Sequence, residues 1–222
     1  MFFNLRLLER IRTEPLPLTG DQSVLCLRSF LDGYAHNRSL RAPEAIWFPI
    51  NDHLRAKYGI SQSAHGYPEL LLLVSSGDTA AFTLFFSELD EYLTAHGTAA
   101  SDPSSWRYPL PQDVEGVERL FPLMETLRAM EARPAMYLGA PSVTRLHAFL
   151  AGELTALQDD GRDIGEMGLL HPFESWLNAR ERFPFRYRWD RILLFRNGGR
   201  DDDAFDEFLE LFRSYMEDVL PQ

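Results

Sequence analysis

The sequence predicts a mostly helical α+β protein built from two tandem copies of one unit. The first observation is that Pro15–Gly33 recurs as Pro134–Gly152, with eight identical positions at a constant offset of 119 residues. A fixed offset of this kind indicates an internal duplication. The second is a short apolar run in each copy, and the third is a phenylalanine-rich helical pattern after each run. The predicted unit is therefore helix, helix, helix, strand, helix.

The length supports two units, which we expect at residues 1–97 and 120–222, with a linker at 98–119. A chain of 222 residues is long enough for two units that each bury a core. The segment from Thr98 to Gly116 is rich in Ser, Pro and Asp, as linkers are. With 13% aromatic and 25% charged residues, the composition is that of an ordered soluble protein.

The charge excludes one class of partner. The net charge is −11, and the residues after 100 carry 22 acidic and 14 basic side chains. A protein that binds a nucleic-acid backbone needs a clustered basic face, so we expect no nucleic acid. An acidic surface favours a basic protein partner or serves only solubility.

The expected location is the cytoplasm. Cys26 is the only cysteine, so no internal disulfide can form, which fits a reducing compartment. Arg6 and Glu9 interrupt the apolar N-terminus, and no run reaches 18 apolar residues. We therefore expect no membrane partner.

The first helices of each copy are predicted from the spacing of apolar residues and from the positions of proline and serine. Leu5, Leu8 and Ile11 have helical spacing, and Pro15 ends that helix; Leu123, Leu127 and Met130 precede Pro134 in the same way. Ser23 and Ser142 are placed to cap the next helix. Gly33 and Gly152 fall inside these second helices, where glycine costs about 1 kcal/mol against alanine. We expect a close approach of a neighbouring backbone at both glycines.

The third helices are expected after Pro49 and Pro172, since proline suits a first helical position. Leu70–Val74 and Ile192–Phe195 are continuous apolar runs, which suit buried strands although their periodicity does not exclude helix. One strand cannot stand alone, so Ala45–Phe48 and Phe185–Trp189 are candidates for further strands.

The last helix of each copy has the strongest pattern. Phe82, Phe85, Phe86 and Leu89 are spaced like Phe205, Phe208, Leu209 and Phe212, at an offset of 123 residues. Such a wide apolar face must be buried.

One heptapeptide resembles a segment of the gyrase-type ATPases. Arg133-Pro-Ala-Met-Tyr-Leu-Gly139 is similar to their Arg-Pro-Gly-Met-Tyr-Ile-Gly string. Those enzymes also need an acid-plus-asparagine box and an Asp-x-Gly-x-Gly turn, whereas here Asp163, Gly165 and Gly168 are misspaced. We therefore favour a proline-initiated turn that packs Met136 and Tyr137 between two helices.

No catalytic, metal or cofactor site is predicted. Asn197–Arg200 could form a phosphate nest, but the three aspartates that follow would repel a phosphate and instead complement a helix N-terminus. Acidic loops lack the calcium-loop pattern, and the histidines lack metal-ligand spacing. Cys26 lies beside an apolar face and is expected to be a buried thiol.

The second copy, from Leu123 to Met216, resembles small uncharacterised bacterial domains found among the immunity-type proteins of polymorphic toxin systems. The resemblance rests on the Pro-x-Met-Tyr-Leu-Gly turn, the Ser-Val-x-x-Leu-x-x-Phe-Leu-x-Gly helix, the tryptophan-led apolar run and the acidic Phe-rich helix. It implies a non-catalytic cytoplasmic binding protein that neutralises a toxin partner. The alternative is a small-ligand binder or an enzyme with a site between the repeats.

Polar residues that differ between the copies are the candidates for contacts with a partner or ligand. These candidates are Arg133, Tyr137, Asp201, Asp202 and Asp203. For the assembly we expect a pseudo-two-fold monomer or a weak oligomer.

Overall fold

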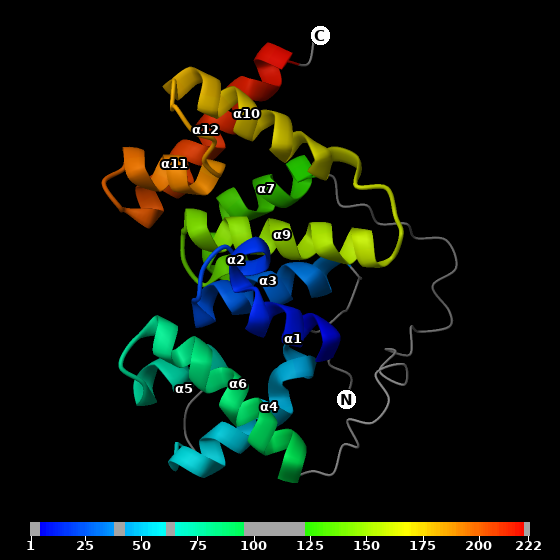
Figure 1. Cartoon of the computed structure of the whole chain (residues 1–222), viewed down its shortest axis with the longest axis vertical. Coiled ribbons are helices and arrows are strands. Elements are labelled where there is room, and N and C mark those ends of the chain that lie inside the picture. Colours follow the sequence, from blue (N-terminus) through cyan, green and yellow to red (C-terminus); the bar gives the residue numbers. More distant parts are fainter. Residues whose placement is uncertain (1–4, 38–42, 61–64, 96–122, 220–222) are drawn as a thin grey trace. The chain divides into compact units, whose positions relative to one another are not determined.

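Every regular element that the structure describes is a helix. The computed structural model describes residues 5–37, 43–60, 65–95 and 123–219. Within these ranges Figure 1 shows coiled ribbons and no strand arrows. The fold is therefore all-α, and the α+β prediction is wrong.

The helices form two sets that run in the same order. The first set is α1 (Leu5–Thr13), α2 (Pro15–Thr19), α3 (Val24–Asn37), α4 (Pro43–Tyr58), α5 (Tyr67–Val74) and α6 (Asp78–Ala95). The second set is α7 (Leu123–Ala132), α8 (Pro134–Leu138), α9 (Val143–Asp159), α10 (Leu170–Glu181), α11 (Trp189–Arg196) and α12 (Asp201–Val219), with the 3-10 helix η2 (Gly165–Leu169) before α10. The short helix α8 lies where the proline-initiated turn was expected, and α2 is its counterpart in the first set, where Pro15 was expected only to end a helix.

Both apolar runs that were predicted as strands are helical. Leu70–Val74 forms the greater part of α5, and Ile192–Phe195 lies inside α11. Runs of four or five apolar residues do not distinguish a strand from a buried helix, and the start signals decide here. Pro68 lies in the first turn of α5, and Asp190 places a carboxylate in the first turn of α11, as helix N-termini favour.

The two further strand candidates are also wrong. Ala45–Phe48 lies inside α4, and Phe185–Arg188 is a connection that ends where Trp189 begins α11. The third helices begin earlier than expected, at Pro43 rather than after Pro49, and at Leu170 rather than after Pro172.

The described residues divide into two compact units that differ from the predicted boundaries. The first contains the residues up to Arg28 and those of α4 to α6. The second contains Ser29–Asn37, which is the C-terminal part of α3, together with α7 to α12. The predicted linker at 98–119 lies outside the described residues. The predicted division into 1–97, 98–119 and 120–222 therefore stays a prediction.

The core of the first unit is centred on the phenylalanine face of α6. Phe82, Phe85 and Phe86 are buried there, as their spacing predicts. The ring of Phe85 lies 5.0 Å from that of Tyr67 on α5. Arg12 of α1 forms an ion pair of 3.0 Å with Asp90 and lies over the ring of Phe86, 5.7 Å from its centroid, so α1 is fixed to α6.

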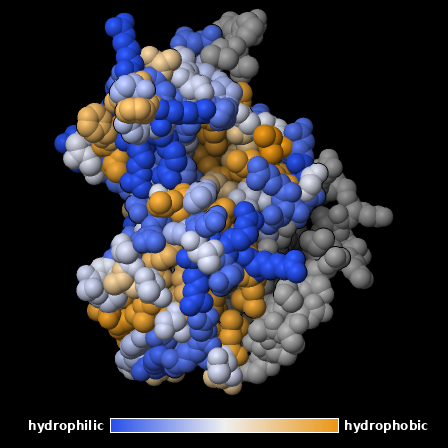
Figure 2. Space-filling model, viewed as in Figure 1, coloured by the Kyte–Doolittle hydropathy of each residue, from blue (hydrophilic) through white to orange (hydrophobic). Residues whose placement is uncertain are grey.

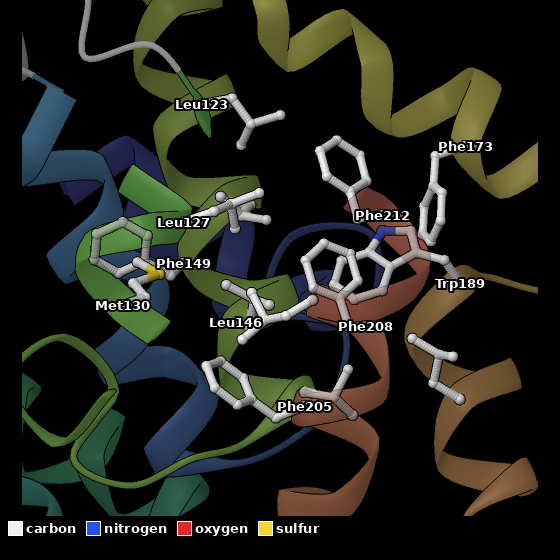
Figure 3. Close-up of a cluster of buried hydrophobic side chains, with 14 of the residues drawn as sticks. Leu123, Leu127, Met130, Leu146, Phe149, Phe173, Trp189, Phe205, Phe208 and Phe212 are labelled. Atoms are coloured by element: carbon white, nitrogen blue, oxygen red, sulfur yellow. The ribbon is translucent and has the colours of Figure 1, made fainter. Parts of the chain in front are cut away.

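The core of the second unit gathers aromatic side chains from α9, α10, α11 and α12 (Figure 3). Phe208 is fully buried, with its ring centroid 4.5 Å from Trp189 and 5.6 Å from Phe173. The face of α12 was expected to be buried, and this is confirmed. Aromatic pairs of this kind add about 0.5–1.5 kcal/mol each beyond the area they bury.

The N-termini of α3 and α9 are capped in parallel ways. The hydroxyl of Ser23 accepts from the amide of Cys26, and that of Ser142 accepts from the amide of Arg145, which confirms both predicted caps. A carboxylate from the start of the last helix adds to each cap. The amide of Val24 donates to Asp78, and the amide of Thr144 donates to Asp201, at 2.8 Å and 3.0 Å.

Among the described residues no single helix is long and apolar enough to cross a bilayer. Helices α5 and α6 reach the required length and hydropathy only together, and they bend by 112° at their junction.

Candidate functional site

Helices α3 and α9 cross at a reciprocal glycine contact within the second unit. A Cβ atom added at Gly33 would lie 2.0 Å from the carbonyl oxygen of Phe149, and one added at Gly152 would lie 2.0 Å from that of Phe30. Phe30 and Gly33 correspond to Phe149 and Gly152 at the offset of 119 residues. The predicted close approach is therefore confirmed at both glycines. Because no side chain separates the backbones, neighbouring polar residues of α3 and α9 come within bonding distance.

One such pair is His36 and Glu153. The Nδ1 atom of His36 lies 2.7 Å from Oε1 of Glu153, whose carboxyl group is 3% exposed. Burial raises the pKa of Glu153 above its ordinary value, although the hydrogen bond with His36 acts in the opposite direction. A buried carboxyl group with a raised pKa and one histidine partner is typical of functional sites. Ion pairs that serve only the fold also shift pKa values, so the pair alone does not identify a site.

A cavity of about 200 Å³ opens beside this pair. It is lined by His36 of α3, by Glu125, Thr126 and Ala129 of α7, and by Tyr137 of α8. The rings of His36 and Tyr137 meet edge to face, with centroids 6.1 Å apart. The cavity therefore combines an aromatic wall with a carboxylate and a hydroxyl group, and we call it the His36 cavity.

The residues of the His36 cavity were not recognised in the sequence as a group, because they come from three helices. Only the position of Glu153, the partner of His36, could have indicated a buried polar group here. It follows Gly152 and lies four residues after Phe149, so it falls on the face that the apolar stripe of α9 buries.

A second polar cluster surrounds Glu88 in the first unit. The side chain of Glu88 is 3% exposed and accepts hydrogen bonds from Tyr58 at 2.7 Å and from Lys57, the only lysine of the chain, at 2.9 Å. Burial alone would raise the pKa of Glu88, but these donors outweigh it and the pKa is lowered. The group is therefore held ionised.

The same cluster contains potential metal ligands. One ligand atom each from His53, Glu88 and Glu91 lies within 4.8 Å of the others, and the spacing of these residues along the chain did not reveal them. The ammonium group of Lys57 already contacts both carboxylates, at 2.9 Å and 2.5 Å. We therefore interpret this cluster as a structural ion network.

Aromatic side chains gather in the connection between α10 and α11 and on α11 itself. This group, which we call the aromatic surface, comprises the half-buried Phe183 and the exposed Phe185, Tyr187 and Phe195. Hydrophobic residues show among hydrophilic ones over the region of α11 (Figure 2). Phe185 and Phe195 are 72% and 74% exposed. The ring of Phe183 lies 5.3 Å from that of Tyr187 and 6.2 Å from that of Phe195.

The segment that carries the aromatic surface is held in place by polar bonds. The side-chain amide of Asn178 donates to the carbonyl of Tyr187 at 2.7 Å, and its oxygen accepts from the Tyr187 amide at 2.9 Å. Arg186 donates to Glu174 at 3.0 Å. Arg196 of α11 forms ion pairs with Glu181 and with Glu207. The exposed rings are thus presented by an ordered connection and by helix α11, with paired charges around them.

The structure does not bring the predicted contact residues together at one site. Tyr137 lines the His36 cavity, whereas Arg133 is the exposed residue that precedes α8 and is not part of the cavity lining. Met136 was expected to be packed, but it is 72% exposed. The prediction for this turn is therefore right for Tyr137, which is half-buried, and wrong for Met136.

The three aspartates lie in the first turn of α12, as expected from their sequence position. Asp201 accepts from the hydroxyls of Ser142 and Thr144, so its role is to cap α9. Its counterpart at the 123-residue offset is Asp78, and it is therefore not a difference between the copies. Asp202 and Asp203 are exposed, and Asp203 is paired with Arg200.

No protein-family model, no curated protein and no solved structure matches this chain.

Proposed function

We propose that the protein is a non-catalytic protein-binding protein whose second unit contacts its partner through the aromatic surface. The observation that carries the proposal is the exposure of Phe185 and Phe195, at 72% and 74%. Phe185 lies in a connection whose backbone Asn178 binds at Tyr187, and Phe195 lies on helix α11. Exposed aromatic groups framed by arginines have the composition of interaction hot spots. An ordered loop also loses less conformational entropy when it binds, so the surface is suited to tight association.

The charge of the second unit indicates the partner's chemistry. Exposed carboxylates recur at four-residue spacing along α12, at Asp202, Asp206 and Glu210. At the 123-residue offset the first copy has Thr79, Thr83 and Ser87, so this acidic row belongs to the second copy alone. Complementary potentials steer association and select partners. We therefore propose a partner with a basic surface.

The narrower proposal is that this partner is a toxin, and that binding neutralises it in the cytoplasm. Support comes from the resemblance of Leu123–Met216 to immunity-type proteins and from the acidic charge. Cys26 is a buried thiol outside any disulfide, as expected, and is compatible with a reducing compartment.

The test is partner capture followed by direct binding. The wild-type chain, a Phe185→Ala/Phe195→Ala variant and a Leu73→Ala control are immobilised and exposed to extracts of the source cells. Leu73 is a matched control because it is an apolar side chain with 70% exposure in the first unit. Captured proteins are identified and purified, and their affinity is then measured by calorimetry.

We expect the wild type and the Leu73→Ala control to bind one basic protein in a 1:1 complex, and the double variant to bind it at least about tenfold more weakly. Co-expression of the chain with that protein should restore growth if the protein is a toxin. Equal affinity of the double variant and the wild type would contradict the proposed surface. If the captured protein retains its toxicity in the complex, the proposal that binding neutralises it would be contradicted, but the proposed binding surface would not.

A further inference from the structure

The His36 cavity has the features of a binding site that is separate from the aromatic surface. Its volume of about 200 Å³ is small for a drug-sized ligand, but it can hold several waters or one compact polar group. Its lining places a carboxylate, at Glu125, near the half-buried ring of Tyr137. The occupant must therefore be small, and a positive charge on it would be stabilised by Glu125.

The polar groups of the cavity favour a hydrogen-bond donor. Thr126 is 3% exposed, and its hydroxyl has no hydrogen-bond partner among the described residues. The oxygen itself has almost no accessible surface, so a ligand in the cavity does not reach it. The carboxylate of Glu125 is exposed and is a pure acceptor when ionised. Among the described residues that line the cavity there is no arginine or lysine to neutralise it.

The corresponding residues of the first copy have the opposite character. At the offset of 119 residues, Glu125 is replaced by Arg6, Thr126 by Leu7 and Tyr137 by Leu18. The charge is inverted at the first position, and both hydroxyl groups are absent at the others. Leu7 and Leu18 are buried side chains of the first unit. The polar residues that α7 and α8 contribute to the lining are therefore specific to the second copy and are not required by the helix packing that the copies share.

We propose that the His36 cavity binds a guanidinium group, with Glu125 as its counter-ion and Tyr137 as its aromatic wall. A guanidinium ion is planar, stacks on aromatic rings and pairs with a carboxylate through two parallel N–H groups. It is also more weakly hydrated than an ammonium ion, so less free energy is lost when it enters a partly enclosed cavity.

Two sources can supply this group, a free alkylguanidine or an arginine side chain of a polypeptide. The probes that separate them are ethylguanidinium chloride and the blocked peptide acetyl-Gly-Arg-Gly-amide, with ethylammonium chloride as the ammonium control. Binding is followed on the full chain by NMR, through the ring signals of His36 and Tyr137. Dissociation constants of about 1–10 mM are expected for such small probes.

Two substitutions test the roles of the lining residues. Glu125→Gln should weaken ethylguanidinium binding about tenfold or more, since a hydrogen bond with a charged group is lost. Thr126→Val removes a buried hydroxyl at nearly constant shape, so it should leave binding unchanged while the melting temperature stays the same or rises. Glu210→Gln on α12 is the control for a lost surface carboxylate, and it should leave binding unchanged.

The outcomes decide the proposal and the source of the group. Tighter binding of the peptide than of ethylguanidinium assigns the cavity to an arginine side chain, and the reverse assigns it to a free alkylguanidine. Absence of any shift at His36 and Tyr137, or equal affinity for ethylammonium, overturns the proposal. So does unchanged binding in Glu125→Gln. None of these results depends on the aromatic surface, so the protein-binding proposal is tested separately.

Discussion

The first and second sets of helices bury the same apolar residues at matching positions but differ in the polar residues that they hold. Phe85 and Phe208 correspond at the 123-residue offset, and both are fully buried. Glu88, with its buried ion network, instead corresponds to Leu211. Conversely, Glu125, Thr126 and Tyr137 of the His36 cavity correspond to Arg6, Leu7 and Leu18 in the first set. The matching residues therefore explain the fold, and the differing residues are where specific binding must be sought.

The largest expected effect tests the shared part of this comparison. Phe85→Ala and Phe208→Ala should each lower the free energy of unfolding by about 3–5 kcal/mol, the usual result of emptying a core aromatic site. Urea denaturation monitored by circular dichroism measures both. A small effect of one and a large effect of the other would show that the two positions are not equivalent.

The glycine crossing should be the next most sensitive point. Gly33→Ala and Gly152→Ala each place a Cβ atom 2.0 Å from a backbone oxygen, so the helices must separate. The expected loss is about 2–3 kcal/mol, which exceeds the gain of about 1 kcal/mol in helix propensity.

Gly168→Ala is the control for the crossing, because its added Cβ would meet only Ile164 side-chain atoms at 3.5 Å. Thermal melts of the three variants provide the measurement. A melting temperature of Gly33→Ala or Gly152→Ala as high as that of Gly168→Ala would show that the close contact is absent in solution.

The two buried glutamates should respond to pH in opposite directions. The pKa of Glu88 is lowered in the folded state, so its contribution to stability is present above its unfolded pKa and is lost as the pH falls through the folded pKa. Glu88→Gln should therefore cost about 1–3 kcal/mol at neutral pH and less in acid.

The pKa of Glu153 is raised in the folded state, so its favourable contribution is complete below its unfolded pKa and is lost as the pH rises through the folded pKa. Glu153→Gln should accordingly stabilise the protein relative to the wild type more at neutral pH than at pH 4. Urea denaturation of both variants at several pH values gives the two slopes. If the free energy of unfolding changed with pH in the same way in both variants, the predicted difference between Glu88 and Glu153 would be contradicted.

The repeated pattern allowed most helices and caps to be predicted, because it depends on local chemistry. The caps at Ser23 and Ser142 and the close approach at Gly33 and Gly152 need only side-chain type and spacing. The prediction fails where one local pattern fits two structures, as in Leu70–Val74 and Ile192–Phe195. An apolar run is buried in either case, and the helix start at Pro68 was the evidence that should have outweighed its length.

The candidate sites could be predicted only in part, because they form between distant segments. Tyr137 was chosen since it differs from its counterpart Leu18, and it does line a cavity. His36 and Glu153 are 117 residues apart, and only the glycine crossing brings them together. Phe185–Trp189 was named as a strand candidate because a single strand cannot stand alone, whereas the structure exposes Phe185 and Tyr187 in a connection.

The account's central claim is that the buried matching residues carry stability, while the aromatic surface of the second unit carries binding. The most direct test is to measure unfolding free energy and partner affinity on one variant, Phe185→Ala/Phe195→Ala. We predict a change of stability within about 0.5 kcal/mol, as is usual for surface positions, and an affinity at least about tenfold weaker than that of the wild type. A variant that loses stability as Phe208→Ala does, while its folded fraction binds the partner with wild-type affinity, would contradict the claim.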